Sequence, residues 1–273
     1  MKQCAQSKVW QTIVQEAREQ AEQEPMLASF YHATIIKHDS LAAALSYILA
    51  NRLETASMPA IAVREVVEEA FKSDPAIAEA AACDICATVN RDPAVSMYSM
   101  PLLYLKGYHA LQGHRVANWL WKQGRQALAT YMQNQISVAC QVDIHPAAKV
   151  GRGIMLDHAT GIVIGETAVV GDDVSILQDV TLGGTGKESG DRHPKIREGV
   201  MIGAGAKILG NIEVGEGAKI GSCSVVLQPV PPHTTVAGVP ARIVGRPKTQ
   251  KPSLDMDQQF NGRTQTFTGG DGI

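Results

Sequence analysis

Hydrophobic residues recur at helical spacing throughout the first half of the chain. Every third or fourth position is apolar over Val9–Ala21 and again over Leu41–Leu53, as expected of helices that bury one face. Start and stop signals such as Asp39-Ser40 separate the periodic segments. The pattern predicts an all-α domain over residues 1–140, with helices at Val9–Ala21, Met26–Ile36, Leu41–Leu53, Ala60–Phe71, Ile77–Val89, Leu102–Trp121 and from Gln126 to about Gln135.

From Val142 onward the hydrophobic period changes to six residues. Hexapeptide repeats of this kind are typical of a parallel β-helix, in which each short strand turns an aliphatic side chain into a narrow prism. Three strands per coil predict a repeat of about 18 residues. The alternative, a β-sandwich with chance spacing, is disfavoured by thirteen positions in register: Ile144, Val150, Leu156, Ile162, Ala168, Val174, Val180, Ile196, Ile202, Ile208, Val214, Ile220 and Val226.

One segment interrupts this period, and another follows its end. Residues 183–195 are polar and glycine-rich and are expected to form a loop that projects from the coil. Binding groups are often found on such loops. Residues 246–273 have no period and are expected to form a flexible tail. The fold class is therefore α+β, with a helical domain over 1–140 and a β-helix over 141–245.

Composition excludes several functional classes. The 273 residues carry a net charge of −2, which does not indicate a nucleic-acid surface. No apolar run approaches the ~20 residues that span a bilayer, and the N-terminus has no apolar signal region, so a cytoplasmic location is expected. Five scattered cysteines favour reduced thiols. The Cys83 and Cys86 pair lies in an Ala-rich segment, where packing is favoured over redox or zinc chemistry.

Titratable residues gather in the β-helical half, and common catalytic templates are absent from it. No Walker, GxGxxG, GxSxG or HExxH pattern occurs. With three hexapeptides in each coil, Asp143 and His158 would lie one layer apart, so that Asp143 could orient the imidazole of a general base. The alternative is that these residues only form solenoid turns. The same half contains His145, Asp157, Asp191, Arg192 and His193.

Several segments together resemble the serine acetyltransferase family, which makes O-acetylserine for cysteine synthesis. They are the hexapeptide series, Asp157-His158-Ala159-Thr160-Gly161, the loop with Gly-Asp-Arg-His-Pro-Lys, the closing Ala237–Arg242, and in the helical half Asp92-Pro93 and Pro101–Gly107. The similarity extends over essentially the whole chain. It implies a left-handed β-helix and a homohexamer built from two trimers. It also implies acetyl-CoA as co-substrate in a groove between β-helices, with no permanently bound cofactor and no metal.

The resemblance also implies roles for the residues that react with serine or bind it. His158 would remove the proton of the serine hydroxyl while Asp143 orients and stabilises the imidazolium. Carboxylates suit the ammonium group of serine, and Arg192 suits its carboxylate. The residues expected around the amino acid are Asp92, Pro93, Asp157, Arg192 and His193.

For acetyl-CoA, the resemblance implies close backbone approach at Gly184, Ala204 and Ser222, and a phosphate contact at Arg242. Ser222-Cys223 stand where the family commonly has Ala-Gly, so this chain departs from the pattern there.

The resemblance implies feedback inhibition by L-cysteine at the serine site. It also implies binding of O-acetylserine sulfhydrylase through the C-terminal Ile273.

Three competing functions remain to be tested. They are acetylation of another hydroxyl acceptor such as a sugar, a metal-dependent hydratase with histidine ligands, and a scaffold that only binds the sulfhydrylase.

Overall fold

The computed structural model describes residues 6–186 and 189–259. Its first part is helical, as the hydrophobic pattern predicts, and no helix of the described residues has the length and apolar character needed to cross a membrane. The helical elements are α1 (Gln6–Gln23), η1 (Pro25–Leu27), α2 (Ala28–Tyr31), η2 (His32–Ile36), α3 (Leu41–Leu53), α4 (Ala60–Ser73), α5 (Ala76–Arg91), α6 (Ser99–Tyr104), α7 (Lys106–Lys122) and α8 (Gln126–Cys140).

Two predicted helices differ from the observed ones. The expected single helix over Met26–Ile36 is divided into η1, α2 and the π-helical η2. The expected helix over Leu102–Trp121 is interrupted at Leu105, whose backbone is extended (φ −87°, ψ 109°). The interruption lies just before a close approach to the β-helix, since a Cβ on Gly107 would be 2.3 Å from the carbonyl oxygen of Leu156. Tertiary packing therefore overrides the local pattern here.

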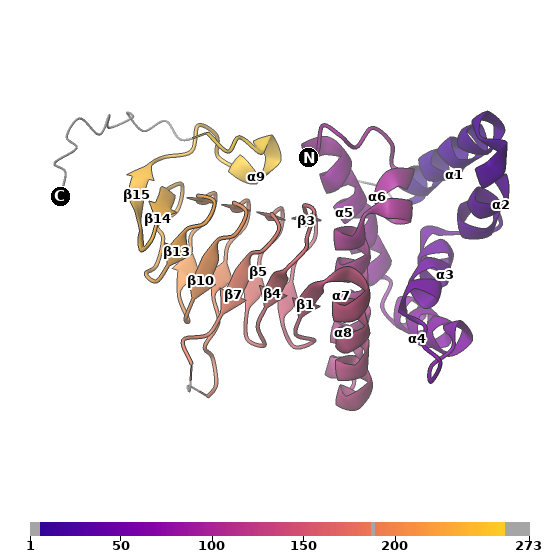
Figure 1. The fold of residues 1–273 in the computed structure, drawn as a ribbon, viewed down its shortest axis with the longest axis horizontal. Helices are drawn as coiled ribbons and strands as arrows, with labels where there is room; N and C mark the ends of the chain where they lie inside the picture. Colours follow the sequence, from indigo (N-terminus) through magenta and orange to yellow (C-terminus); the bar gives the residue numbers. More distant parts are fainter. Residues whose placement is uncertain (1–5, 187–188, 260–273) are drawn as a thin grey trace, which may run out of the picture.

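Short strands form a left-handed parallel β-helix with three faces (Figure 1). The first sheet has the order β1-β4-β7-β10-β13, the second β11-β8-β5-β2 and the third β15-β14-β12-β9-β6-β3. The strands are β1 (Val142–Ile144), β2 (Lys149–Val150), β3 (Met155–Leu156), β4 (Ile162–Ile164), β5 (Val169–Val170), β6 (Ser175–Ile176), β7 (Thr181–Gly183), β8 (Lys195–Ile196), β9 (Met201–Ile202), β10 (Lys207–Leu209), β11 (Glu213–Val214), β12 (Lys219–Ile220), β13 (Val225–Val226), β14 (Thr235–Gly238) and β15 (Ala241–Gly245).

The six-residue period is confirmed as the origin of the core. Twelve of the thirteen repeat positions are buried, and Val150 is partly buried. The predicted coil length holds from β4 to β7, where Val163 pairs with Thr181. It is wrong for the first coil, where Asp143 pairs with Val163 and not, as three hexapeptides would require, with Gly161. The predicted coil length is also wrong for the coil that contains the predicted loop. The loop residues lengthen this coil, so that Val169 pairs with Lys195.

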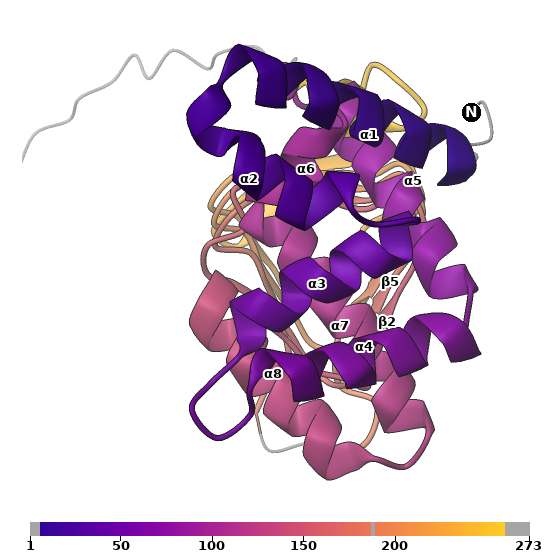
Figure 2. The same ribbon diagram turned by 90° about the vertical axis from the view of Figure 1, so that its right-hand side faces the viewer.

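The helical domain covers the N-terminal end of the prism (Figure 2). A buried polar cluster joins the two parts around Asp84 of α5. Its carboxylate accepts hydrogen bonds from Gln112 Nε2 at 2.9 Å, Arg115 Nη2 at 2.7 Å and the backbone N–H of Ile154 at 2.9 Å. Burial raises the pKa of Asp84, and the Arg115 guanidinium opposes that rise. The orientation of the prism on the helices therefore rests on a paired internal charge.

The segment after β15 differs from the expected flexible tail. Residues 246–259, here called the strap, turn back along the third sheet and include the short helix α9 (Pro252–Asp255). Figure 1 shows α9 beside the β-helix, and it contacts β9 of the third sheet and α5. The remaining residues, including Ile273, lie outside the described part of the chain.

The cysteines only partly match the expectation of reduced thiols. Cys83, Cys140 and Cys223 are free, whereas Cys86 is disulfide-bonded. Cys83 and Cys86 therefore do not form a bond with each other.

Candidate functional site at two edges of the β-helix

The predicted site residues fall mainly on two edges of the prism. Turns that lead from the third sheet to the first form one edge, here called the His158 edge. Turns that lead from the first sheet to the second form the other, here called the His193 edge. The strand β4 runs between them, and at ~3.3 Å per residue it separates them by roughly 13 Å.

The His158 edge begins with an unusual turn. His158 and Ala159 both have left-handed backbones (φ 53° and 62°), which is costly for residues with a Cβ. This turn accounts for the longer first coil. Ala159 is buried beneath it while the His158 side chain is 77% exposed. The turn therefore holds the imidazole outward on a fixed backbone.

Two carboxylates act at this turn. His158 Nε2 lies 3.9 Å from Asp157 Oδ1. Burial raises the pKa of Asp157, His158 lowers it and Asp92 raises it further, so the Asp92 charge acts at this turn. Asp92 follows α5, and its Oδ1 accepts a hydrogen bond from Ala94 N at 2.9 Å. Pro93 is exposed beside it. The helical domain thus adds a second carboxylate to the His158 edge.

The His193 edge is organised by Thr167. Its hydroxyl accepts hydrogen bonds from the backbone N–H groups of Arg192 at 3.0 Å and His193 at 3.1 Å. Its own N–H donates to His193 Nδ1 at 3.2 Å. Because Nδ1 accepts this bond, the neutral ring carries its proton on Nε2. Burial, and next the Arg192 charge, lower the pKa of His193.

Arg192 is held by a partner that sequence patterns do not indicate. Its Nη2 lies 2.6 Å from Glu166 Oε2. The hydrogen bond from Arg192 lowers the pKa of Glu166. Sequence reasoning misses Glu166 and Thr167 because they occupy an ordinary hexapeptide turn, and only the pairing of coils brings them to the loop.

Asp143 lies away from both turns, on β1 of the first sheet. Its Oδ1 accepts a hydrogen bond from Gln133 Nε2 of α8 at 2.6 Å. Burial lowers the pKa of nearby His145, and the charges of Glu166 and Asp143 oppose that shift. The prediction that Asp143 lies close to His158 assumes a coil of three hexapeptides. The first coil is longer than that, so the predicted spacing is wrong. Among residues 6–186 and 189–259, no hydrogen bond or ion pair joins Asp143 to His158.

The residues expected to approach acetyl-CoA divide between the edges. Ala204 and Ser222 lie in later turns of the His158 edge, in line with His158. These turns stack closely, because a Cβ on Gly203 would be 2.6 Å from Ser222 N. Gly184 lies on the His193 edge, where an added Cβ would be 3.5 Å from Arg192 Cγ. Arg242 is exposed on β15, at the far end of the prism.

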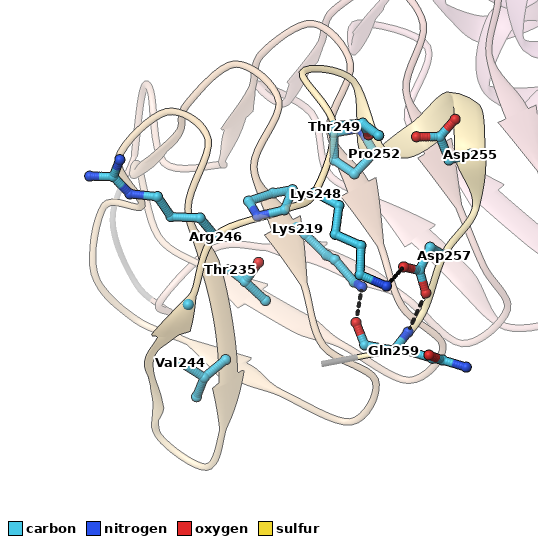
Figure 3. A pocket seen from close by; sticks show the side chains of 12 residues that line it. Lys219, Thr235, Val244, Arg246, Lys248, Thr249, Pro252, Asp255, Asp257 and Gln259 are labelled. Carbon is cyan, nitrogen blue, oxygen red and sulfur yellow. Dashed lines mark hydrogen bonds and ion pairs between the residues drawn. The ribbon is translucent and has the colours of Figure 1, made fainter. Parts of the chain in front are cut away.

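A separate cavity of about 320 Å³ lies between the third sheet and the strap (Figure 3). Lys219 donates to the carbonyl of Gln259 at 2.6 Å, and Lys248 pairs with Asp257 at 3.2 Å across it. None of the residues expected to bind serine or acetyl-CoA lines this cavity. In the described part of the chain, no group of three or more His, Cys, Asp or Glu side chains is arranged to hold a metal ion.

Comparisons with known proteins identify the family. The family model "Serine acetyltransferase, N-terminal" matches residues 9–113, and "Bacterial transferase hexapeptide (six repeats)" matches residues 193–228. The chain is 73% identical over 265 residues to a serine acetyltransferase of Salmonella typhimurium, covering 97% of each.

Solved structures agree. The crystal structure of serine acetyltransferase from Vibrio cholerae has 91% identity and a TM-score of 0.94, covering 94% of this chain and 100% of that one. A serine acetyltransferase in complex with cysteine has 67% identity and a TM-score of 0.92, with coverage of 94% and 100%. Another, in complex with CoA, has 66% identity and a TM-score of 0.85, with coverage of 88% and 100%.

Proposed function

Because the chain belongs to the serine acetyltransferase family, a family of acyltransferases, we propose that it transfers the acetyl group of acetyl-CoA to the hydroxyl of L-serine. The products are O-acetyl-L-serine and CoA. The observation that carries this proposal is an exposed imidazole on a left-handed turn, with the Asp157 carboxylate beside it and the Asp92 charge acting on Asp157. That turn is in line with the stacked turns of Ala204 and Ser222, a path that an extended thioester could follow.

In the proposed mechanism His158 acts as the general base. A serine hydroxyl is a weak nucleophile at neutral pH, so His158 removes its proton as the oxygen attacks the thioester carbonyl. The tetrahedral intermediate collapses with loss of the CoA thiolate, to which the imidazolium returns the proton. We also propose that Asp143 stabilises that imidazolium. In the single chain the Asp143 carboxylate accepts a hydrogen bond from Gln133.

The amino-acid groups of serine determine which charges must surround it. Asp92 and Asp157 suit the ammonium group because both are carboxylates and Asp157, next to His158, senses the charge of Asp92. Arg192 and His193 suit the serine carboxylate, since both can donate N–H groups to its oxygens. Cysteine has the same ammonium and carboxylate groups, and the relative in complex with cysteine supports competitive feedback inhibition at this site.

The separation of the two edges supports a site shared between copies of the chain. One molecule of serine is too small to contact His158 and His193 across roughly 13 Å of β4. A neighbouring copy that brings its His193 edge to the His158 edge of the first would unite both sets. The family resemblance implies a homohexamer of two trimers, and we propose that the shared sites lie between neighbouring copies in that assembly.

Complementation between two impaired variants, assayed at a low L-serine concentration, tests the shared site. His158→Ala is expected to lower turnover by about 10² to 10⁴-fold, and His193→Ala to raise the KM for serine. Co-expressed, the two variants should form mixed assemblies in which about one site in four is intact, so that about a quarter of wild-type activity returns. No recovery in demonstrably mixed assemblies would contradict the shared site.

Acceptor specificity tests the reaction itself. Thiol release from acetyl-CoA should be supported by L-serine far better than by sugars or by amines. Release with a sugar hydroxyl but not with L-serine would refute the assignment. Removal of the last ten residues should abolish binding to O-acetylserine sulfhydrylase, the proposed partner of the tail that ends at Ile273, while acetyl transfer is retained.

A further inference from the structure

The strap is connected to the proposed serine site through a chain of charged side chains, of which Arg91 and Asp173 are buried. Lys251 Nζ of the strap lies 3.3 Å from Asp173 Oδ2 and also pairs with Glu198. Asp173 Oδ1 in turn accepts a hydrogen bond from Arg91 Nη2 at 3.2 Å. Arg91 is the last residue of α5, and the next residue is Asp92.

Arg91 is a firm anchor for the end of α5. Its side chain is 2% exposed, and that of Asp173 is 6% exposed. Arg91 Nη1 donates to Ser175 Oγ at 3.1 Å and to the carbonyl of Val174 at 3.4 Å. In the described residues, the guanidinium thus finds its partners on one short segment of the β-helix. Rotation or withdrawal of α5 would leave a buried cation unpaired, which is strongly unfavourable.

A second contact joins the same cluster to the strap backbone. Ser175 Oγ donates to the carbonyl of Ser253 in α9 at 3.0 Å, while it accepts from Arg91. The backbone N–H of Ser253 donates to the carbonyl of Gly199 at 3.4 Å. The strap therefore covers the Arg91 and Asp173 pair and excludes water from it, which strengthens the electrostatic attraction within it.

We propose that Arg91, Asp173 and Lys251 are positioning residues, through which the strap sets the location of Asp92 and hence the affinity for the amino-acid substrate. This inference rests on the proposed function, in which Asp92 receives the serine ammonium group. The strap contributes no group to the substrate. It keeps the anchor of α5 dry and paired, so that the Asp92 carboxylate stays beside Asp157 and His158.

The test is a comparison of steady-state kinetics between strap variants. Lys251→Gln removes the strap cation from a partly exposed position and is expected to raise the KM for L-serine about tenfold, an effect of the size that supporting contacts often have. The kcat and the KM for acetyl-CoA should stay within about twofold of wild type, because neither reacting group is touched. Lys251→Arg should restore the serine KM, since it keeps the charge.

Two further variants complete the experiment. Ser175→Ala removes the link between Arg91 and the strap carbonyl with little change of volume, and it should raise the serine KM in the same way. Arg197→Gln breaks the exposed Arg197 and Glu213 ion pair of the same β-helix and is the matched control, with wild-type kinetics expected.

The outcomes separate this inference from the proposed function. If wild-type protein does not acetylate L-serine, both are refuted. If wild type does so, and Lys251→Gln and Ser175→Ala lower the melting temperature but leave the serine KM unchanged, the cluster is only structural and this inference alone fails. Equal changes in kcat and in the KM of both substrates would also overturn it, because a general loss of structure would then explain the data.

Discussion

A single methyl group at Gly165 should displace the imidazole of His193. An ideal Cβ at this position would lie 2.0 Å from both Cδ2 and Nε2 of the His193 ring and 2.8 Å from Cε1. Because non-bonded carbon atoms pack at about 3.5 Å, Gly165→Ala must move the ring by about 1.5 Å. The backbone of Gly165 is outside the left-handed region, so alanine adds no backbone strain of its own.

The cost to stability should be moderate. Moving the ring breaks its hydrogen bonds with Thr167, at 3.2 Å from the N–H and 2.9 Å from the hydroxyl. A neutral hydrogen bond contributes about 0.5–1.5 kcal/mol, and overpacking costs about 1–3 kcal/mol. The free energy of unfolding should therefore fall by about 2–6 kcal/mol, and the assembly should persist.

Gly165→Ala should also reduce the reaction with L-serine. A displacement of about 1 Å in a positioning group can cost about 10²-fold in rate, so kcat/KM for L-serine should fall by about that factor. The KM for acetyl-CoA should change much less, because Ala204 and Ser222 are on the other edge and only Gly184 shares the edge of His193. Inhibition by L-cysteine should weaken in parallel, since it would use the same carboxylate contacts.

The assay is initial-rate measurement of thiol release at varied L-serine, with and without L-cysteine. Gly245→Ala is the control, because a Cβ at Gly245 meets no atom within 4 Å. Wild-type serine kinetics in a folded Gly165→Ala protein would refute the role of His193. A loss of serine affinity without any loss of cysteine inhibition would refute the shared binding site.

Two predictions concern stability. Burial lowers the pKa of His109 to about 4 and of His114 to about 3, so both rings stay neutral in the native state while the unfolded chain takes up protons below about pH 6.5. The free energy of unfolding should therefore decrease as pH falls, by about 2 kcal/mol per imidazole between pH 7 and pH 5; urea titrations that give equal values at the two pH values would contradict this. Arg115→Met leaves the Asp84 carboxylate buried without its cation and should cost about 3–5 kcal/mol. Adding Asp84→Asn should recover part of that loss in the same titrations, because the neutral amide can still accept from Ile154 N–H, and no recovery would show that charge is not the cause.

The β-helix can be predicted from the sequence because its period is local. Each hexapeptide carries its own aliphatic residue, and residues such as Ile162 and Ile208 are buried whatever the length of a coil. The helical half is likewise predictable from its hydrophobic spacing. The motifs around His158 and His193 also indicate the family, since they lie in continuous segments.

The arrangement of the site depends on quantities that no local pattern contains. The left-handed turn at His158 and Ala159 lengthens the first coil. Asp143 therefore pairs with Val163 and not with the residue that a regular period predicts. Glu166 and Thr167 meet Arg192 only because the loop returns to the neighbouring coil.

The strap is the clearest example of a structure that local sequence patterns do not predict. Its sequence is polar and without period, which predicts a flexible segment. It folds because Lys251 pairs with Asp173 and the Ser253 carbonyl accepts a hydrogen bond from Ser175. Both of these β-helix residues also bind Arg91 of α5. The sequence alone determined which residues are apolar and how often they recur. The tertiary structure decided which polar residues become neighbours, because buried charges are stable only where distant segments supply their partners.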